Sequence, residues 1–188
     1  MHWTPEQARE FLELMQGDRT YPVWAFLLGS GLRIGELVWL RWANVDLARR
    51  HVRVVEFAST LGHDLVSSSG KSREAVRTIE LDDGLVRVLR AQRAAQHEES
   101  LASATYVPSG FVFTKVDGGW YHPQYLSRLI GRYSEELQLP RCWRVVCPKV
   151  AAERLGHADP TLFTNLYSHV TPTMQRDAAD KIGSALFD

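Results

Sequence analysis

Apolar residues recur at helical spacing in the N-terminal part of the chain and predict three short helices. The segment Thr4-Pro5-Glu6-Gln7 opens the first, because threonine can cap a helix, proline fits its first turn and glutamine completes a capping box. The apolar run Val23–Leu28 predicts a second helix that ends at Gly29–Gly31. A third helix is expected to begin near Arg33, with one side formed by Ile34, Leu37, Val38 and Arg41.

The pattern then changes to the two-residue alternation of β-strands. Apolar and polar residues alternate over His51–Phe57, and further strand segments are expected at Leu65-Val66 and Ala75–Leu81. The turn-forming residues Ser67–Gly70 separate the last two segments. Together these segments predict a small antiparallel sheet between helical blocks.

Helical patterns return after the sheet. A helix is expected to start at Asp82-Asp83 and to reach about Gln96, before a linker over His97–Pro108. Later helices are expected over His122–Leu137, Pro148–Leu155 and Pro160–Tyr167, and from Thr171-Pro172 onward. This order predicts an α+β fold that is mostly helical, with a small antiparallel sheet near the N-terminal third, in a single domain over residues 1–188.

Composition is that of an ordinary globular protein. Of the 188 residues, 45% are hydrophobic and 23% are charged. No apolar run approaches the roughly 18 residues that span a bilayer, and the start lacks a signal-peptide core, so a cytoplasmic protein without a membrane segment is expected. Cys142 and Cys147 lack a second Cys or His pair at ligand spacing, so no metal or other cofactor is expected.

Charge is balanced overall but unevenly distributed. The formal net charge is zero, which argues mildly against a nucleic-acid partner. Basic residues nevertheless form three runs, each of which could be a solvated face: Arg41, Arg49, Arg50 and Arg53; Lys71, Arg73 and Arg77; and Arg141, Arg144, Lys149 and Arg154. These runs permit a basic surface without establishing one.

Three short motifs carry candidate chemistry. The sequence GLRIGEL places Arg33 at the start of a helix, where backbone N–H groups and the helix dipole favour an anion. Lys71 is expected on or beside a β-turn, and Leu155-Gly156-His157 stands ten residues before Tyr167. Each residue alone has an ordinary structural explanation, so only their combination and order indicate a site.

In this order and at these spacings, the motifs resemble the catalytic domain of the tyrosine recombinase (phage integrase) family over nearly the whole chain. The resemblance implies that Tyr167 attacks a phosphodiester of double-stranded DNA, giving a 3′-phosphotyrosine link and a free 5′-hydroxyl without a metal. Arg33 would clamp the phosphate and His157 would donate to it. Lys71 would protonate the leaving 5′-oxygen, and Glu36 would orient its neighbours.

The chain departs from the family pattern over Leu139–Val150. Family members carry a His-x-x-Arg box here at the start of a buried helix, but no histidine occurs between His122 and His157. A helix and its connection, roughly fifteen residues, are expected to be missing near 141–147. Loss of one oxyanion-type donor typically costs about 10²–10³ in rate, and two groups would be lost here. We therefore expect a catalytically impaired remnant of a DNA recombinase.

Two alternatives remain open. Arg141 or Arg144 could replace the missing arginine, which would give an active recombinase. A non-catalytic DNA-binding module is the other alternative, because Pro148–Leu155 and Pro160–Tyr167 superficially resemble a helix-turn-helix. Thr161-Leu162-Phe163 is more apolar than the start of a recognition helix should be, so this alternative ranks last.

The two ends of the chain give expectations about DNA binding and about protein partners. Family members carry an N-terminal helical domain that completes a clamp around DNA, and this chain is expected to lack it because it begins at the first helix of the catalytic domain. The last helix carries one apolar stripe, made of Met174, Ala178, Ile182 and Leu186. In the family this segment often packs on a neighbouring protomer, so a second copy or another integrase is a candidate partner. Packing within the chain is equally compatible with the stripe.

Overall fold

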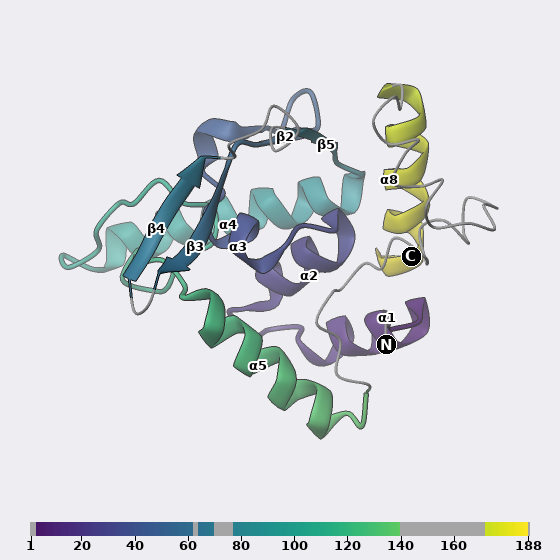
Figure 1. The fold of residues 1–188 in the computed structure, drawn as a ribbon, viewed down its shortest axis with the longest axis horizontal. Coiled ribbons are helices and arrows are strands. Elements are labelled where there is room, and N and C mark those ends of the chain that lie inside the picture. The colour runs from purple at the N-terminus through teal and green to yellow at the C-terminus, as the bar shows by residue number, and fades with distance from the viewer. Residues whose placement is uncertain (1–2, 62–63, 70–76, 140–171, 188) are drawn as a thin grey trace.

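A small antiparallel sheet lies at the edge of a group of helices in the structure, a computed structural model that describes residues 3–61, 64–69, 77–139 and 172–187 (Figure 1). The helices are α1 (Pro5–Leu14), α2 (Tyr21–Ser30), α3 (Ile34–Val38), the 3-10 turn η1 (Trp42–Asn44), α4 (Asp83–Ala102), α5 (Pro123–Glu136) and α8 (Pro172–Phe187). The strands are β1 (Val45–Asp46), β2 (His51–Val54), β3 (Glu56–Leu61), β4 (Asp64–Ser69) and β5 (Arg77–Glu80). The expected α+β class is confirmed.

α1 begins and α2 ends where the local sequence signals predict, although α2 starts at Tyr21 and not at Val23. The Thr4 hydroxyl accepts the backbone N–H of Gln7 at 3.3 Å, and the Gln7 side chain accepts the backbone N–H of Thr4 at 2.9 Å, which completes the capping box of α1. α2 ends at Gly31, whose φ is 68°. That left-handed backbone favours glycine, which has no Cβ to clash.

The described strands form two sheets rather than one. β1, β2 and β5 make an antiparallel sheet in the order β1-β2-β5, and β3 pairs with β4 as a separate hairpin (Figure 1). The expected single strand over His51–Phe57 is wrong, because it divides between β2 and β3. Ser67–Ser69 lie in β4 and not in a turn. Alternation indicates extended backbone, but it does not say which strand each segment pairs with.

α4 continues two turns of helix past the predicted end, so the linker expected from His97 starts only after Ala102. Polar side chains on its inner face find specific partners there. The Gln96 amide donates to the carbonyl of Val112 at 2.9 Å, and the Glu99 carboxylate pairs with Arg19 at 2.6 Å. Polar residues such as Glu99, which suggest a linker in the sequence, therefore belong to the helix and have partners inside the fold.

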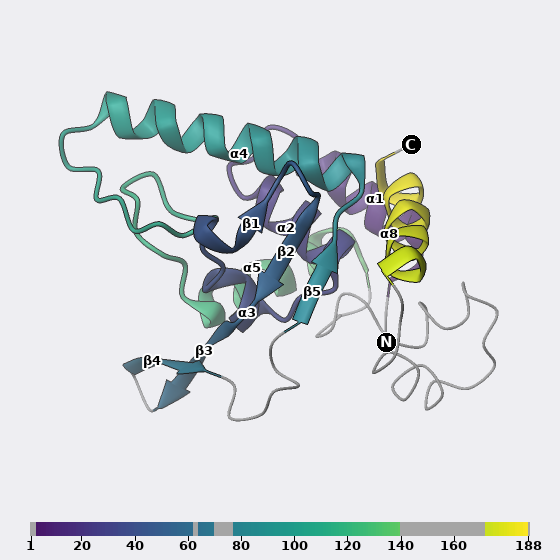
Figure 2. The same cartoon turned by 90° about the horizontal axis from the view of Figure 1, so that it is seen from above.

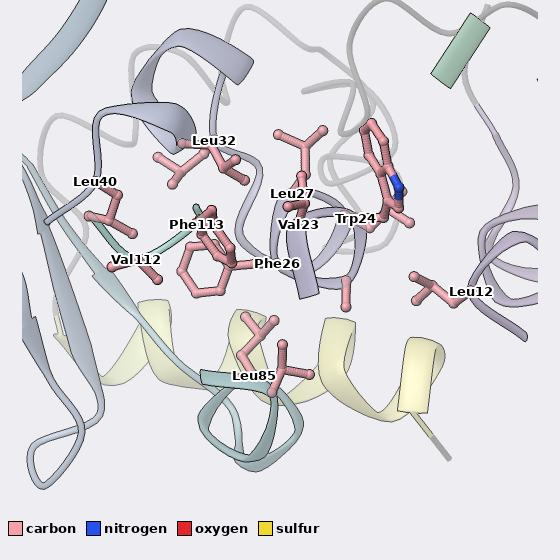
Figure 3. Close-up of a cluster of buried hydrophobic side chains, with 14 of the residues drawn as sticks. Leu12, Val23, Trp24, Phe26, Leu27, Leu32, Leu40, Leu85, Val112 and Phe113 are labelled. Atoms are coloured by element: carbon pink, nitrogen blue, oxygen red, sulfur yellow. The ribbon is translucent and has the colours of Figure 1, made fainter. Parts of the chain in front are cut away.

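The core lies around α2, whose residues Val23–Leu28 are each exposed by 4% or less. Figure 3 shows Phe26 of α2 beside Phe113, with Leu85 of α4 nearby; the two phenyl rings are 5.5 Å apart between centroids. Trp24 meets the edge of Phe11 of α1 with centroids 6.1 Å apart. A helix that is apolar on all sides is stable only when it is enclosed in this way.

α8 packs within its own chain, against α1, α2, α4 and β5. Arg176 donates to the Glu80 carboxylate of β5 at 2.8 Å, and Leu186 is buried. A Cβ on Gly183 would lie 2.4 Å from Cγ of Asp82, so only glycine lets α8 approach the start of α4 this closely. The C-terminal part of the apolar stripe, Ile182 and Leu186, therefore packs on its own chain.

Asp82 lies where α8 meets the start of α4. One of its carboxylate oxygens accepts a hydrogen bond, and the other is buried without a partner among the described residues. Its Oδ1 accepts the backbone N–H of Leu85 at 3.0 Å, and Oδ2 has no hydrogen bond. Burial raises the pKa of Asp82, with a further contribution from the charge of Asp180 and against the effect of backbone hydrogen bonds. The native state then binds this proton more tightly than the unfolded chain, so stability should fall as the pH rises above 3.8.

We expect Asp82→Asn to remove this part of the pH dependence, because asparagine keeps the capping oxygen but carries no charge. The free energy of unfolding, measured with urea between pH 4 and about 8, should decline less steeply with pH in the variant than in the wild type. Asp180→Asn is the matched control, since it removes the neighbouring charge and leaves the buried carboxyl. Parallel curves for Asp82→Asn and the wild type would mean that another group titrates.

Candidate functional site

Two of the expected catalytic-site residues, Arg33 and Glu36, belong to the part of the chain that the structure describes. The other candidates, together with the gap expected near 141–147, lie outside the described residues: Lys71, Arg141, Arg144, His157 and Tyr167. The helices expected over Pro148–Leu155 and Pro160–Tyr167 lie outside them as well. The described part of the site is therefore the cluster around Arg33.

Arg33 occupies the N-cap position of α3, where its backbone is extended with φ −73° and ψ 148°. Small polar residues are preferred at this position because their side chains cap the helix, so arginine gives up that contribution to stability. The Arg33 side chain is 79% exposed, and its guanidinium lies 3.2 Å from the Glu36 carboxylate. Because most of the side chain is exposed, N–H groups outside this contact can reach an anion.

α3 is shorter than the sequence predicts. It ends at Val38, and the chain then turns so that the Leu40 carbonyl accepts the backbone N–H of Val112 at 2.8 Å. Arg41, expected on the helix, instead forms an isolated bridge with Phe111. A helix of five residues has a small dipole, so the attraction for an anion comes from the Arg33 guanidinium itself.

Glu36 is the buried centre of the cluster and has an exposed fraction of 6%. Arg77, the first residue of β5, donates to both of its carboxylate oxygens, from Nη1 to Oε1 and from Nη2 to Oε2, each at 2.8 Å. The backbone N–H of Arg33 also donates to Oε2 at 2.8 Å. One carboxylate therefore ties the start of α3 to the start of β5 and faces two guanidinium groups.

The Glu36 carboxylate is held ionised in spite of its burial. Burial is the largest single influence and acts to raise the pKa, but the hydrogen bonds from Arg77 and from the Arg33 backbone outweigh it, with the charges of both arginines adding to them. The pKa of Glu36 is therefore lowered from its usual 4.5. Two cations around one anion leave a net positive charge, and Arg33 is the more exposed of the two cations.

Arg77 is the site residue that sequence reasoning missed, because it was grouped with a basic run that could be a solvated face. A signal existed in the sequence. Glu36 stands three residues after Arg33 among apolar residues of a short helix, and a carboxylate that becomes buried there needs a cation to pair with it. Arg77, which lies inside the strand predicted over Ala75–Leu81, was one of several basic residues that could supply this cation.

Chemically, the arrangement suits phosphate binding. An arginine fork held on one edge by a carboxylate can present its other edge to two oxygens of a phosphate. Within the described ranges, no group of three or more His, Cys, Asp or Glu side chains could hold a metal ion. None of the helices in those ranges is long and apolar enough to cross a membrane.

The sequence is similar to a known protein family and to individual recombinases and integrases. The model of the phage integrase family matches residues 3–139. The chain is 24% identical to a protein described as tyrosine recombinase XerC-like from Caldanaerobacter subterraneus subsp. tengcongensis, covering 96% of this chain and 53% of that protein. It is 25% identical to the ICEBs1 integrase of Bacillus subtilis, covering 98% of this chain and 54% of that one. The chain thus spans about half the length of these relatives.

Solved structures show the same fold. The Tn1549 transposon integrase, in complex with transposon right end DNA, matches with a TM-score of 0.64 and 22% identity over 95% of this chain and 65% of that one. XerA recombinase matches with a TM-score of 0.60 and 18% identity over 96% of this chain and 64% of that one. Because the family model covers well over half of the sequence, the chain belongs to the phage integrase family.

Proposed function

We propose that this chain is the catalytic domain of a tyrosine recombinase that cleaves and rejoins DNA through Tyr167, with an impaired rate. The supporting observation is the exposed guanidinium of Arg33, positioned by a buried Glu36–Arg77 pair in a chain of the phage integrase family. Related integrase structures described as DNA complexes support DNA as the partner. A chromosomal DNA substrate would place the protein in the cytoplasm.

In the proposed reaction the Tyr167 phenol gives its proton to water, its oxygen forms a bond to phosphorus, and the bond from phosphorus to the 5′-oxygen breaks. Lys71 gives a proton to that leaving oxygen. Arg33 and His157 donate hydrogen bonds to the non-bridging oxygens, where negative charge develops. Resealing runs the same steps backwards, so no cofactor is consumed.

Glu36 and Arg77 would act as positioning residues in this scheme. The bidentate bond from Arg77 engages both Glu36 oxygens, so the carboxylate holds the Arg33 guanidinium by one contact at 3.2 Å without neutralising it fully. Without Arg77, the whole carboxylate charge would face Arg33 and would compete with DNA phosphate for its guanidinium.

The proposed impairment follows from the missing His-x-x-Arg box. The family-model match ends at residue 139, before the segment in which the box is expected. An active enzyme in which Arg141 or Arg144 supplies the second arginine is the alternative.

Covalent trapping tests this function. Nicked suicide duplexes, taken from the DNA that flanks the gene and from random pools, would be incubated with the wild type and with Tyr167→Phe. We expect a Tyr167-dependent, SDS-resistant adduct that forms at least about 10²-fold more slowly than with an intact relative on its own site. Tyr125→Phe is the matched control, since Tyr125 is an exposed tyrosine of α5 and should leave the adduct unchanged.

Three outcomes would contradict parts of the proposal. An adduct as fast as that of the intact relative would favour an active enzyme and make Arg141 and Arg144 the next targets. An adduct that survives Tyr167→Phe would exclude Tyr167 as the nucleophile. No adduct from folded protein that still binds duplex DNA would favour a binding module without the reaction.

A further inference from the structure

The outer surface of α4 carries three exposed arginines, Arg87, Arg90 and Arg93. None of them forms an ion pair with a carboxylate among the described residues, and Arg93 lies over the ring of Trp42 at 5.4 Å. The sequence explains the lack of helical pairing: of the residues four positions away, only Asp83 is acidic, and it pairs with Arg50 at 2.8 Å. Arginines on a solvated helix are usually interspersed with such partners.

The turn between β1 and β2 extends this surface alongside α4. It is tied to one end of the helix by the Arg50–Asp83 pair, and η1 is tied further along by a 2.8 Å hydrogen bond from Trp42 to Gln96. Between them is an open pocket of about 540 Å³, lined in part by His51, Arg53 and Arg93.

Asp46 is the acidic residue of this pocket, and its carboxylate is already engaged. It accepts the backbone N–H groups of Ala48 at 3.0 Å and Arg49 at 2.8 Å, which form the β1–β2 turn. These hydrogen bonds, the one from Arg49 first, lower the pKa of Asp46, and the charges of His51 and Arg49 assist. The pocket therefore combines one fixed carboxylate with two arginines and a histidine.

The charge of this surface differs from that of the whole chain. Arg49, Arg50, Arg53, Arg87, Arg90 and Arg93 contribute six positive charges against three from Asp46, Asp83 and Glu98, which leaves three in a chain whose net charge is zero. α4 runs along one side of the molecule, whereas α3 and the β3–β4 hairpin lie towards the other (Figure 2). The α4 part of this positive surface therefore lies on a different side of the molecule from Arg33.

We infer that this surface, called here the α4 basic face and defined by Arg53, Arg87, Arg90 and Arg93 with His51, binds the phosphate backbone of a second nucleic-acid segment. The three α4 arginines span about 9 Å along the helix, which corresponds to about three phosphates of one DNA strand. Arginine suits this contact because its planar fork binds two phosphate oxygens. The contact is sequence-independent and does not require activity at Tyr167.

The salt dependence of duplex binding tests the inference. Arg53→Gln/Arg90→Gln/Arg93→Gln should reduce the slope of log K against log salt by about 3, because each lost phosphate contact removes about 0.9. The charge-matched control, Lys115→Gln/Arg128→Gln/Lys181→Gln, removes three exposed cations from elsewhere and should change the slope by less than about 1. Equal changes in the two variants, or no change in the first, would overturn the inference.

The same pair of variants in an Arg33→Ala background separates this surface from the proposed recombinase site. We expect the slope change from the α4 basic face to be the same in both backgrounds. If Arg33→Ala alone has no effect, the proposed function is weakened while the α4 basic face stands. If the α4 changes lose their effect without Arg33, the two surfaces are one site and the inference fails.

Chemical protection of the wild type gives a second measurement that needs no folded variant. Arginine modification by phenylglyoxal, read by mass spectrometry, should be slowed at Arg53, Arg90 and Arg93 by a duplex, with Arg128 as the internal reference. Polyglutamate at equal charge should protect them less. Equal protection by polyglutamate would indicate an acidic protein as the partner and overturn the nucleic-acid assignment, as would the absence of protection by the duplex.

Discussion

Arg77→Met is expected to lower the free energy of unfolding by about 2 kcal/mol. The change leaves Glu36, exposed by only 6%, without its bidentate partner. Removing one member of a buried ion pair typically costs about 3–5 kcal/mol. The lower figure applies here because the Arg77 side chain is 37% exposed and Glu36 keeps the hydrogen bond from the Arg33 backbone. Urea unfolding of the two proteins at pH 7 gives the difference directly.

The double variant Glu36→Gln/Arg77→Met is the matched control for this prediction. A neutral amide tolerates burial better than an unpaired carboxylate and can still accept the Arg33 N–H, so the double variant should be more stable than Arg77→Met alone. A double variant that is less stable than the single one would mean that the charge of Glu36 is not the cause.

The pH dependence supplies an independent check. The pKa of Glu36 is lowered in the folded state, so its contribution to stability is present above pH 4.5 and is lost as the pH falls through the lower folded value. The stability difference between the wild type and Arg77→Met should therefore shrink in acid. A difference that stays constant down to about pH 3 would contradict the ionised pair.

Trp24→Ala is expected to have the largest effect on stability, a loss of about 4 kcal/mol, because large-to-small changes at buried aromatic positions cost about 3–5 kcal/mol. The Trp24 side chain is fully buried in α2 and contacts Phe11 of α1. Its indole N–H donates to the Thr20 hydroxyl at 2.8 Å, so the change also leaves that group without its donor. Such a loss is a large share of the total stability of a domain.

Two further variants bracket the expected cost of Trp24→Ala. Trp24→Phe keeps most of the apolar volume and should cost less than half as much. Leu101→Ala removes a side chain that is 76% exposed and should change the free energy of unfolding by less than about 0.5 kcal/mol. Equal losses for Trp24→Ala and Leu101→Ala, measured by thermal and urea unfolding, would mean that the space around Trp24 is not closely packed.

Local chemistry accounts for the elements that the sequence predicts well. The capping box at Thr4 and the glycine at position 31 act through backbone groups of their own segments, and both boundaries are confirmed. The end of α4 is different, since its last two turns contain Gln96 and Glu99, whose partners come from distant parts of the chain. The residues next to Gln96 and Glu99 in the sequence do not indicate these distant partners.

The candidate site also has features that follow from neighbouring residues and others that depend on distant segments. The placement of Arg33 at the start of a helix and the supporting position of Glu36 follow from a single heptapeptide. The role of Arg77 does not, because it lies 41 positions away and meets Glu36 only when β5 is placed beside the start of α3. The contributions of Lys71, His157 and Tyr167 stay predictions from the family pattern.

The α+β class, the start of α1, the end of α2 and the family motifs can be predicted without a structure, because caps, turns and periodicity act over a few neighbouring residues. The separate β3–β4 hairpin, the packing of α8 on its own chain and the pairing of Glu36 with Arg77 appear only in the folded molecule. Each of these depends on burial and on hydrogen bonds between distant segments. Their free energies are realised only when the chain has folded.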